Sequence, residues 1–364
     1  MEFIDLKAQQ ALIKGEIDER IAAVLEHGRY VLGPEVDEVE QQLADYVGVE
    51  HCLTVASGTD ALLIALMALG IGPGDEVITI PYTWISTAEV IALVGATPVF
   101  VDIDEQTWNM DPVLLEAAIT DKTKAIMPVG IYGQSANLQA ISSIAENHGG
   151  LPVIEDAAQC FGATHHGHKA CSTTLIGCTS FFPSKPLGCY GDGGAVFTND
   201  SDLAEKMQQI RVHGQASKHF HPILGINGRM DTIQAAILMP KLAIFDQEIE
   251  KRQKVAARYS EAIHAHADQI VTPFVAEENT SVWAQYTILS DNRDSLNQAL
   301  GEAGIPSVSY YATPLHLQPV FANLGHVKGD FPVTERVADQ CLSLPMNPYL
   351  SEEDIDTVCR AFSE

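Results

Sequence analysis

The sequence predicts an α/β protein: a mostly parallel β-sheet covered by helices on both faces, followed by a smaller α+β region. Strand-like and helix-like segments alternate along residues 35–198, which is typical of βαβ units. The strand-like segments are continuous runs rich in Val and Ile, as expected for strands that are buried on both faces. The chain contains no internal repeat and no low-complexity tract.

The alternation begins with a helix over residues 35–47, where apolar residues recur at helical spacing behind a Gly-Pro pair. Residues 61–69 form the next helix, because the turn SGTD precedes them and Gly70 ends them. Further helices are expected over residues 87–93, 112–119 and 138–148. The intervening strands are expected at residues 51–55, 76–80, 98–102, 124–129, 152–156, 178–182 and 195–198.

A long amphipathic helix is expected from Asp231 towards His264, and Pro240 is expected to kink it. Beyond it, one half-buried strand and two helices are expected, at residues 282–289, 295–303 and 352–362.

The chain has 364 residues, enough for two domains. We predict a large domain over residues 1–245, which includes an N-terminal arm, and a small C-terminal α+β domain over residues 246–364.

The charge balance and the apolar runs limit the partners. With 48 acidic and 21 basic residues, the net charge is −27, which argues against nucleic acid and anionic membranes. No apolar run approaches the ~20 residues of a membrane span. Residues 1–5 lack the basic and apolar regions of a signal peptide, so we expect a cytoplasmic protein.

The seven cysteines are scattered and contain no CxxC pair. Reduced thiols are therefore expected, with neither a disulfide framework nor a zinc cluster, and no metal site is predicted. Cys160 and Cys189 lie near the motifs described next and are expected to be packing residues.

One lysine stands between a strand-like run and a glycine-rich turn. Residues 178–182 have the bias of a strand, and the turn GDGG at residues 191–194 precedes the next strand. Lys185 therefore lies near backbone, where burial or a positive neighbour lowers a lysine's pKa, and the free amine can form a Schiff base with an aldehyde cofactor or a ketone. The competing interpretation is a solvated loop lysine, which the exposure statistics favour for a lysine considered alone.

Three further junctions supply polar groups. The turn at residues 56–60 lets backbone N–H groups approach an anion such as phosphate, although the same residues also suit a helix cap. In EDAAQ at residues 155–159, Asp156 emerges at the carboxyl end of an apolar strand, where it could pair with a protonated ring nitrogen or cap the next segment. In NGRMD at residues 227–231, an N-cap explains the final Asp, whereas Arg229 could bind a carboxylate or phosphate.

Together these groups match the requirements of pyridoxal 5′-phosphate. Lys185 would form the Schiff base, and Ser180 supplies a further hydroxyl. Asp156 on the pyridine nitrogen would make the ring an electron sink. Trp84 or Tyr82, just beyond a predicted strand, is placed to stack on the ring.

Five motifs resemble the DegT/DnrJ/StrS family of sugar-nucleotide aminotransferases: SGTDAL at 57–62, EDAAQ at 155–159, SFFPSK at 180–185, GDGG at 191–194 and NGRMD at 227–231. The similarity extends over essentially the whole chain, from Ile4 to Met346. The resemblance implies the fold-type I architecture of aspartate aminotransferase relatives, with a seven-stranded type of sheet in the large domain. It also implies a homodimer whose active sites are shared between subunits.

The resemblance implies a role for each matching residue. Lys185 is the Schiff-base lysine, Asp156 pairs with the pyridine nitrogen, and Gln159 contacts the pyridoxal hydroxyl. The remaining contacts are to the phosphate, from Gly58, Thr59, Ser180 and the partner's Asn227, and to the ring face, from Trp84. A dehydratase branch of the family has histidine in place of the lysine, so the lysine favours transamination.

Within the family, residues 184–194 look most like the enzymes that aminate C3 of UDP-2-acetamido-2-deoxy-3-oxo-D-glucuronate for cell-surface polysaccharide (O-antigen) biosynthesis. The donor would be L-glutamate, which leaves as 2-oxoglutarate, and Arg229 would reach a carboxylate from the partner subunit. The sugar side departs from the expected HYP, since Tyr310, Tyr311 and an alanine stand there, followed by His316. The alternative substrate is therefore a UDP- or dTDP-linked 4-keto-6-deoxy or 3-keto-6-deoxy hexose.

Lys185 would serve both as the covalent tether and as the acid and base that moves a proton between glutamate and the cofactor. Two other classes compete with this interpretation. A non-catalytic regulator that retains the fold would be indicated by loss of Lys185 or Asp156, and both are present. An NAD-dependent Rossmann enzyme would need GxGxxG after its first strand, and the chain has none there.

Overall fold

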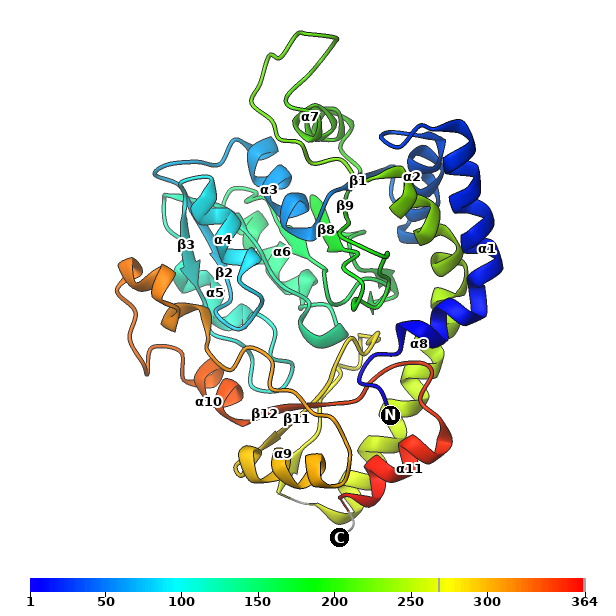
Figure 1. Ribbon diagram of the computed structural model, residues 1–364. Coiled ribbons are helices and arrows are strands. Elements are labelled where there is room, and N and C mark those ends of the chain that lie inside the picture. The colour runs from blue at the N-terminus through cyan, green and yellow to red at the C-terminus, as the bar shows by residue number, and fades with distance from the viewer. Residues whose placement is uncertain (268, 363–364) are drawn as a thin grey trace.

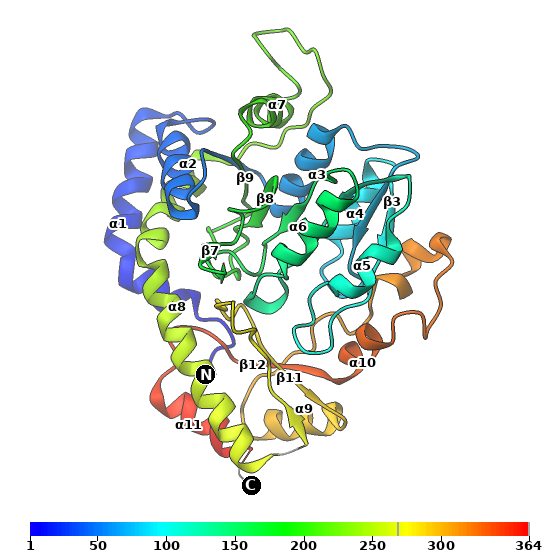
Figure 2. The ribbon, with the colours of Figure 1, turned by 180° about the vertical axis from the view of Figure 1, so that it is seen from behind.

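Figure 1 shows the computed structural model, which describes residues 1–267 and 269–362. A large body with a central sheet lies above a smaller sheet with its own helices. One long helix, α8 (Thr232–His266), runs along both parts, as the opposite view in Figure 2 also shows.

Seven strands form the central sheet: β1 (His51–Val55), β2 (Glu76–Thr79), β3 (Thr97–Phe100), β4 (Thr123–Ile126), β5 (Ile154–Asp156), β8 (Ile176–Ser180) and β9 (Gly194–Thr198). Two groups, in the orders β3-β2-β4 and β5-β8-β9-β1, are joined by parallel bridges from Ile126 to Val153 and from Val129 to Asp156. β9 runs antiparallel to β1 and β8, whereas the pairs β2–β3, β2–β4 and β5–β8 are parallel. The predicted α/β class with a mostly parallel sheet is confirmed.

Helices cover both faces of this sheet (Figures 1 and 2). In α3 (Gly58–Leu69), the Ser57 side chain accepts the N–H of Asp60, and Gly70 ends the helix with φ 72°. The alanine, leucine and isoleucine residues between these caps pack on the strands. The other helices are α2 (Pro34–Val47), α4 (Ser86–Leu93), α5 (Pro112–Ala118), α6 (Leu138–Asn147) and α7 (Ser201–Arg211).

The C-terminal region has a sheet of order β10-β11-β12, formed by β10 (Ile270–Val271), β11 (Tyr286–Ser290) and β12 (Cys341–Leu344). Its helices are α9 (Arg293–Glu302), α10 (Pro332–Gln340) and α11 (Glu352–Arg360). α8 contains Pro240, continues across residue 245 and contacts α2 and α11. The division of the chain after residue 245 and the kink at Pro240 stay predictions.

The N-terminal helix α1 (Leu6–His27) is not among the predicted elements, because its apolar residues do not follow a regular helical period. Ile13 and Ile17 nevertheless pack against Ile237 of α8. The strand predicted over residues 282–289 begins only at Tyr286. Trp283 has φ 50°, a left-handed conformation that a strand does not contain.

Within the described ranges, no helix has both the length and the apolar character needed to cross a bilayer, and no cluster of three or more metal-binding side chains occurs. Six cysteines are buried thiols outside any disulfide: Cys52, Cys160, Cys171, Cys178, Cys189 and Cys341.

Candidate active site

Two neighbouring strands of the central sheet end at polar residues. β5 ends at Asp156 and the parallel β8 ends at Ser180. The N-terminus of α3 meets the same edge, since a Cβ on Gly58 would lie only 2.6 Å from Cβ of Ser180. Strand ends and a helix N-terminus therefore converge where ligands bind in open α/β sheets.

The first turn of α3 offers unpaired backbone donors. Ser57 accepts the N–H of Asp60 at 3.0 Å, whereas the N–H groups of Gly58 and Thr59 have no acceptor in the part of the chain that the structure describes. The Thr59 hydroxyl lies 2.7 Å from that of Ser86. Because the helix dipole is positive at this end, the turn can bind an anion of the size of phosphate.

Asp156 is buried and only partly satisfied. Its Oδ2 accepts from the Thr87 hydroxyl at 2.8 Å and its Oδ1 from the Ala158 N–H at 3.1 Å. Burial raises the pKa of this carboxyl, while the two hydrogen bonds and the charge of Lys185 act to lower it. A carboxylate has about four acceptor positions, so these bonds leave room for a further donor such as a protonated ring nitrogen.

The loop after β8 carries Lys185 close to Asp156. The N–H of Lys185 donates to the Phe182 carbonyl at 2.9 Å, which forms a tight turn; β8 itself ends two residues earlier than predicted. Burial lowers the pKa of the Lys185 ammonium, and the Asp156 carboxylate opposes this change. A lowered pKa increases the share of neutral, nucleophilic amine at neutral pH.

Gln159 links the large body to the C-terminal region. Its Oε1 accepts from the Tyr132 N–H, and its Nε2 donates to the Tyr311 hydroxyl, both at 3.0 Å. The Tyr311 ring stacks on Tyr132 with centroids 6.1 Å apart, and its edge contact with Tyr82 has centroids 5.7 Å apart. Tyr311 has φ 57°, a strained conformation for this residue type. The sugar-side tyrosine predicted from the sequence thus contacts the residue predicted to bind the pyridoxal hydroxyl.

The other predicted residues lie at the margins of this group. Trp84 is 61% exposed just before α4, and Tyr310 packs against Phe3. Asn227 is exposed and Arg229 half-buried, and both follow the loop after α7 that projects from the body in Figures 1 and 2. Their placement in a neighbouring subunit's site stays a prediction.

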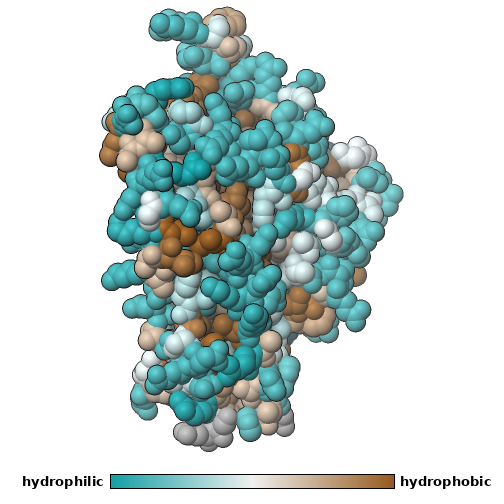
Figure 3. Space-filling view, turned by 90° about the vertical axis from the view of Figure 1, so that its right-hand side faces the viewer, coloured by the Kyte–Doolittle hydropathy of each residue, from teal (hydrophilic) through white to brown (hydrophobic). Residues whose placement is uncertain are grey.

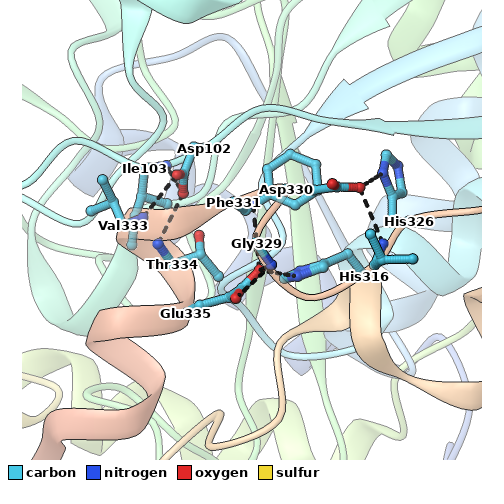
Figure 4. Close-up of polar contacts among 11 residues, drawn as sticks. Asp102, Ile103, His316, His326, Gly329, Asp330, Phe331, Val333, Thr334 and Glu335 are labelled. Atoms are coloured by element: carbon cyan, nitrogen blue, oxygen red, sulfur yellow. Dashed lines mark hydrogen bonds and ion pairs between the residues drawn. The ribbon is translucent and has the colours of Figure 1, made fainter.

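Figure 4 shows that His316 lies in a separate polar cluster. Its Nε2 is 3.1 Å from Oε1 of Glu335, whose carboxylate also accepts the N–H of Gly329. Burial lowers the pKa of His316, and Glu335 opposes this change. The imidazole therefore holds the segment that precedes α10, and a sugar contact by His316 stays a prediction.

Glu155 was given no role by the sequence analysis. Because strand residues alternate, its side chain lies on the opposite face of β5 from Asp156. It is 1% exposed, and its carboxylate accepts the Cys171 N–H at 2.7 Å. Burial raises the pKa of Glu155 to about 7, against hydrogen bonds from Cys171 and Ser135 that lower it. The sequence signal that could have identified Glu155 is the presence of a further carboxylate beside Asp156 in the motif EDAAQ.

A pH dependence of stability follows from Glu155. Its folded pKa of about 7 exceeds the ordinary 4.5, so the folded chain holds more protons than the unfolded chain between these values. The free energy of unfolding is therefore expected to decrease by about 3 kcal/mol as the pH rises from below the unfolded pKa through the folded pKa. Glu155→Gln is expected to reduce the difference in the free energy of unfolding between about pH 5 and about pH 8, measured by urea unfolding of the apoprotein.

Glu105→Gln, at an exposed glutamate, is the matched control for this experiment. A difference that stays the same in Glu155→Gln would contradict the raised pKa.

The groups at this edge fit pyridoxal 5′-phosphate. The missing Cβ of Gly58 leaves space beside Ser180, the α3 N-terminus suits the phosphate, Asp156 has acceptor capacity to spare, and the amine of Lys185 has a lowered pKa. With the order of the central sheet, they define a fold-type I pyridoxal-phosphate enzyme of the aminotransferase class.

The chain belongs to the DegT/DnrJ/EryC1/StrS aminotransferase family, whose pattern matches residues 11–363. UDP-2-acetamido-2-deoxy-3-oxo-D-glucuronate aminotransferase of Pseudomonas aeruginosa is 54% identical over 363 residues, 100% of this chain and 99% of that protein. A pleiotropic regulatory protein of Geobacillus stearothermophilus is 47% identical, over 99% of this chain and 97% of its own.

A solved structure of NtdA from Bacillus subtilis, with bound cofactor PMP, has a TM-score of 0.90 and 32% identity to this chain. The match covers 99% of this chain and 82% of that one. The resemblance, the fold type and the enzyme class expected from the sequence are confirmed.

Gly58→Ala is expected to weaken the binding of pyridoxal phosphate to the apoprotein by roughly tenfold or more, the worth of one charge-assisted hydrogen bond. The new methyl would lie 2.6 Å from Cβ and 3.1 Å from Cα of Ser180, so the α3 turn and the end of β8 must move apart. An absorbance titration measures the affinity. Gly15→Ala, with nothing within 4 Å of the new methyl, is the control. Equal affinities in the two variants would rule out close packing at Gly58 as a requirement.

Proposed function

We propose that this protein transfers the amino group of L-glutamate to C3 of UDP-2-acetamido-2-deoxy-3-oxo-D-glucuronate, with pyridoxal 5′-phosphate as cofactor. The observation that carries the proposal is the 54% identity, over the full length of both chains, to a relative named for that substrate. The grouping of Lys185, Asp156 and the α3 N-terminus supports the same chemistry.

When bound, the cofactor supplies an aldehyde that accepts the amino group and a ring that stores electrons. Lys185 holds that aldehyde through its amine and, once released, moves the proton at the glutamate α-carbon. Asp156 would hold positive charge on the ring nitrogen. The phosphate would be bound by Gly58, Thr59 and Ser180, the pyridoxal hydroxyl by Gln159, and the ring face by Trp84.

The functional unit in this proposal is a homodimer with shared sites. The loop that precedes Asn227 and Arg229 projects from the body and carries Phe220 and Leu224, which are 60% and 87% exposed. The face over α1 also shows apolar patches among hydrophilic side chains (Figure 3). Leu12 and Leu25, which belong to α1, are 62% and 57% exposed. Such surfaces mark contacts between proteins. Asn227 would reach the partner's phosphate site, and Arg229 would bind a carboxylate of the sugar or of glutamate.

On the sugar side we place Tyr310, Tyr311 and His316, and the contact of Tyr311 with Gln159 supports the placement of Tyr311. The enzyme would work in the cytoplasm on a nucleotide-linked precursor of a cell-surface polysaccharide such as O-antigen. The net charge of −27 disfavours nucleic acid and anionic membranes as partners.

The test is to incubate the pyridoxamine form with a panel of UDP- and dTDP-linked keto sugars and to identify the aminated product. Amination of the 3-oxo-glucuronate at C3 is expected. An inert 3-oxo-glucuronate beside a reactive 4-keto-6-deoxy or 3-keto-6-deoxy hexose would replace the proposed substrate.

A non-catalytic regulator is the second candidate, since one relative is named a pleiotropic regulatory protein. This candidate would be favoured if the protein binds the cofactor, aminates no sugar in the panel, and does not convert bound pyridoxal phosphate to the pyridoxamine form when glutamate is added.

A further inference from the structure

The start of α4 contacts both ends of the cofactor site. The Ser86 hydroxyl lies 2.7 Å from that of Thr59 at the phosphate end, and the Thr87 hydroxyl donates to Oδ2 of Asp156 at 2.8 Å at the ring-nitrogen end. Thr87 is completely buried, so its hydroxyl cannot be satisfied by bulk water. One short segment therefore touches the two groups that bind opposite ends of the cofactor.

The direction of the hydrogen bonds around Thr87 is set by chemistry. An ionised carboxylate only accepts, so the single hydroxyl proton of Thr87 points to Asp156. The Thr83 hydroxyl, 3.3 Å from that of Thr87, can then donate to the oxygen of Thr87. Two hydroxyls in series polarise each other towards the carboxylate, which strengthens the last hydrogen bond.

The backbone of Asp156 is fixed independently of Thr87. Its N–H donates to the Pro128 carbonyl at 2.9 Å, and its carbonyl accepts the Gly130 N–H at 3.0 Å. What Thr87 controls is therefore the carboxyl group alone. If the hydroxyl were removed, Oδ2 of this buried carboxylate would lose its one side-chain donor among the described residues.

We propose that Thr87 is a positioning residue that keeps the Asp156 carboxylate ionised and directed at the ring nitrogen of the cofactor. The inference rests on the proposed function, because it assigns the ring nitrogen to Asp156. Thr83 assists as the second hydroxyl of the series.

The expected pH effect has a definite sign. Burial raises the pKa of Asp156 and the Thr87 hydrogen bond lowers it, so removal of that hydroxyl raises the pKa further. The carboxylate is then protonated at higher pH. The acidic limb of the pH profile, which is the pH range where cofactor affinity falls as the pH is lowered, is therefore expected to move to higher pH. The titratable groups around Asp156 are Lys185, Glu155, Cys160, Cys178 and Tyr311.

The experiment measures the dissociation constant of pyridoxal phosphate against pH for the wild type, Thr87→Val and Thr87→Ser. Valine keeps the shape and removes the hydroxyl, so affinity is expected to fall roughly tenfold near neutral pH, the worth of a hydrogen bond to a charged group. The acidic limb should move to higher pH, and serine should restore both properties. Thr83→Val, which leaves Thr87 in place, should move the limb in the same direction by less.

Thr79→Val is the matched control, since Thr79 is buried and its hydroxyl donates to the Met127 carbonyl at 2.9 Å in the same sheet. It should lower the melting temperature without moving the acidic limb. Thr87→Val that behaves like Thr79→Val would overturn the inference. If Thr87→Val does not fold, the inference is overturned by Thr83→Val when that variant leaves the acidic limb where the wild type has it. Failure of the proposed function looks different, because the wild type would then bind pyridoxal phosphate but would not aminate the 3-oxo-glucuronate in the sugar panel.

Discussion

Replacing Lys185 with alanine is expected to lower turnover on the order of a thousandfold or more and to remove the visible absorbance band of covalently held cofactor. In the proposed mechanism the amine both holds the aldehyde and moves the proton, and a positioned acid or base alone contributes about 10²–10⁴-fold. Absorbance spectra and single-turnover conversion of glutamate measure the two effects.

Lys241→Met is the control for this lysine. Lys241 is also buried, its pKa is lowered to about 8 by burial, and its ammonium lies 4.8 Å from the centre of the Tyr190 ring. This variant should keep the band. If Lys185→Ala retains full turnover and native cofactor occupancy, the role of Lys185 is wrong.

Asp156→Asn is expected to lower the rate of the glutamate half-reaction roughly a hundredfold or more. A neutral amide cannot stabilise a positive ring nitrogen, and the loss of one partner of a buried charge pair costs about 3–5 kcal/mol. The rate is measured by stopped-flow absorbance with glutamate in excess.

Asp102→Asn provides the comparison, since Asp102 is a buried aspartate just beyond β3 that accepts the N–H groups of Val333 and Thr334 at 3.0 and 2.9 Å (Figure 4). It should affect stability and leave the half-reaction intact. Equal rates for Asp156→Asn and the wild type would remove Asp156 from the mechanism.

The central sheet was predictable because its strands are short apolar runs separated by turns that can be recognised locally. The edges agree within a few residues, as for the strand predicted over residues 76–80 and found at Glu76–Thr79. α1 escaped prediction because its buried face is defined by α8, more than 200 residues away along the chain. The left-handed Trp283 shortened a predicted strand, and its residue type gives no sign of this conformation.

The same distinction applies to the site. Gly58, Asp156 and Lys185 each stand at a strand end or turn, so local sequence singled them out. The hydrogen bond from Thr87 to Asp156 joins residues 69 apart, and the one from Gln159 to Tyr311 joins residues 152 apart. Such contacts depend on how the elements pack, which no local pattern records.

The left-handed backbone of Tyr311 has an evolutionary consequence. Glycine at this position would relieve strain of about 1 kcal/mol or more, but it would also remove the ring that packs on Tyr132 and the hydroxyl that Gln159 contacts. Because truncation of a packed aromatic side chain costs about 3–5 kcal/mol, the contacts of Tyr311 outweigh the strain of its backbone. Laboratory evolution for heat resistance alone should therefore retain an aromatic residue at this position despite its strained backbone.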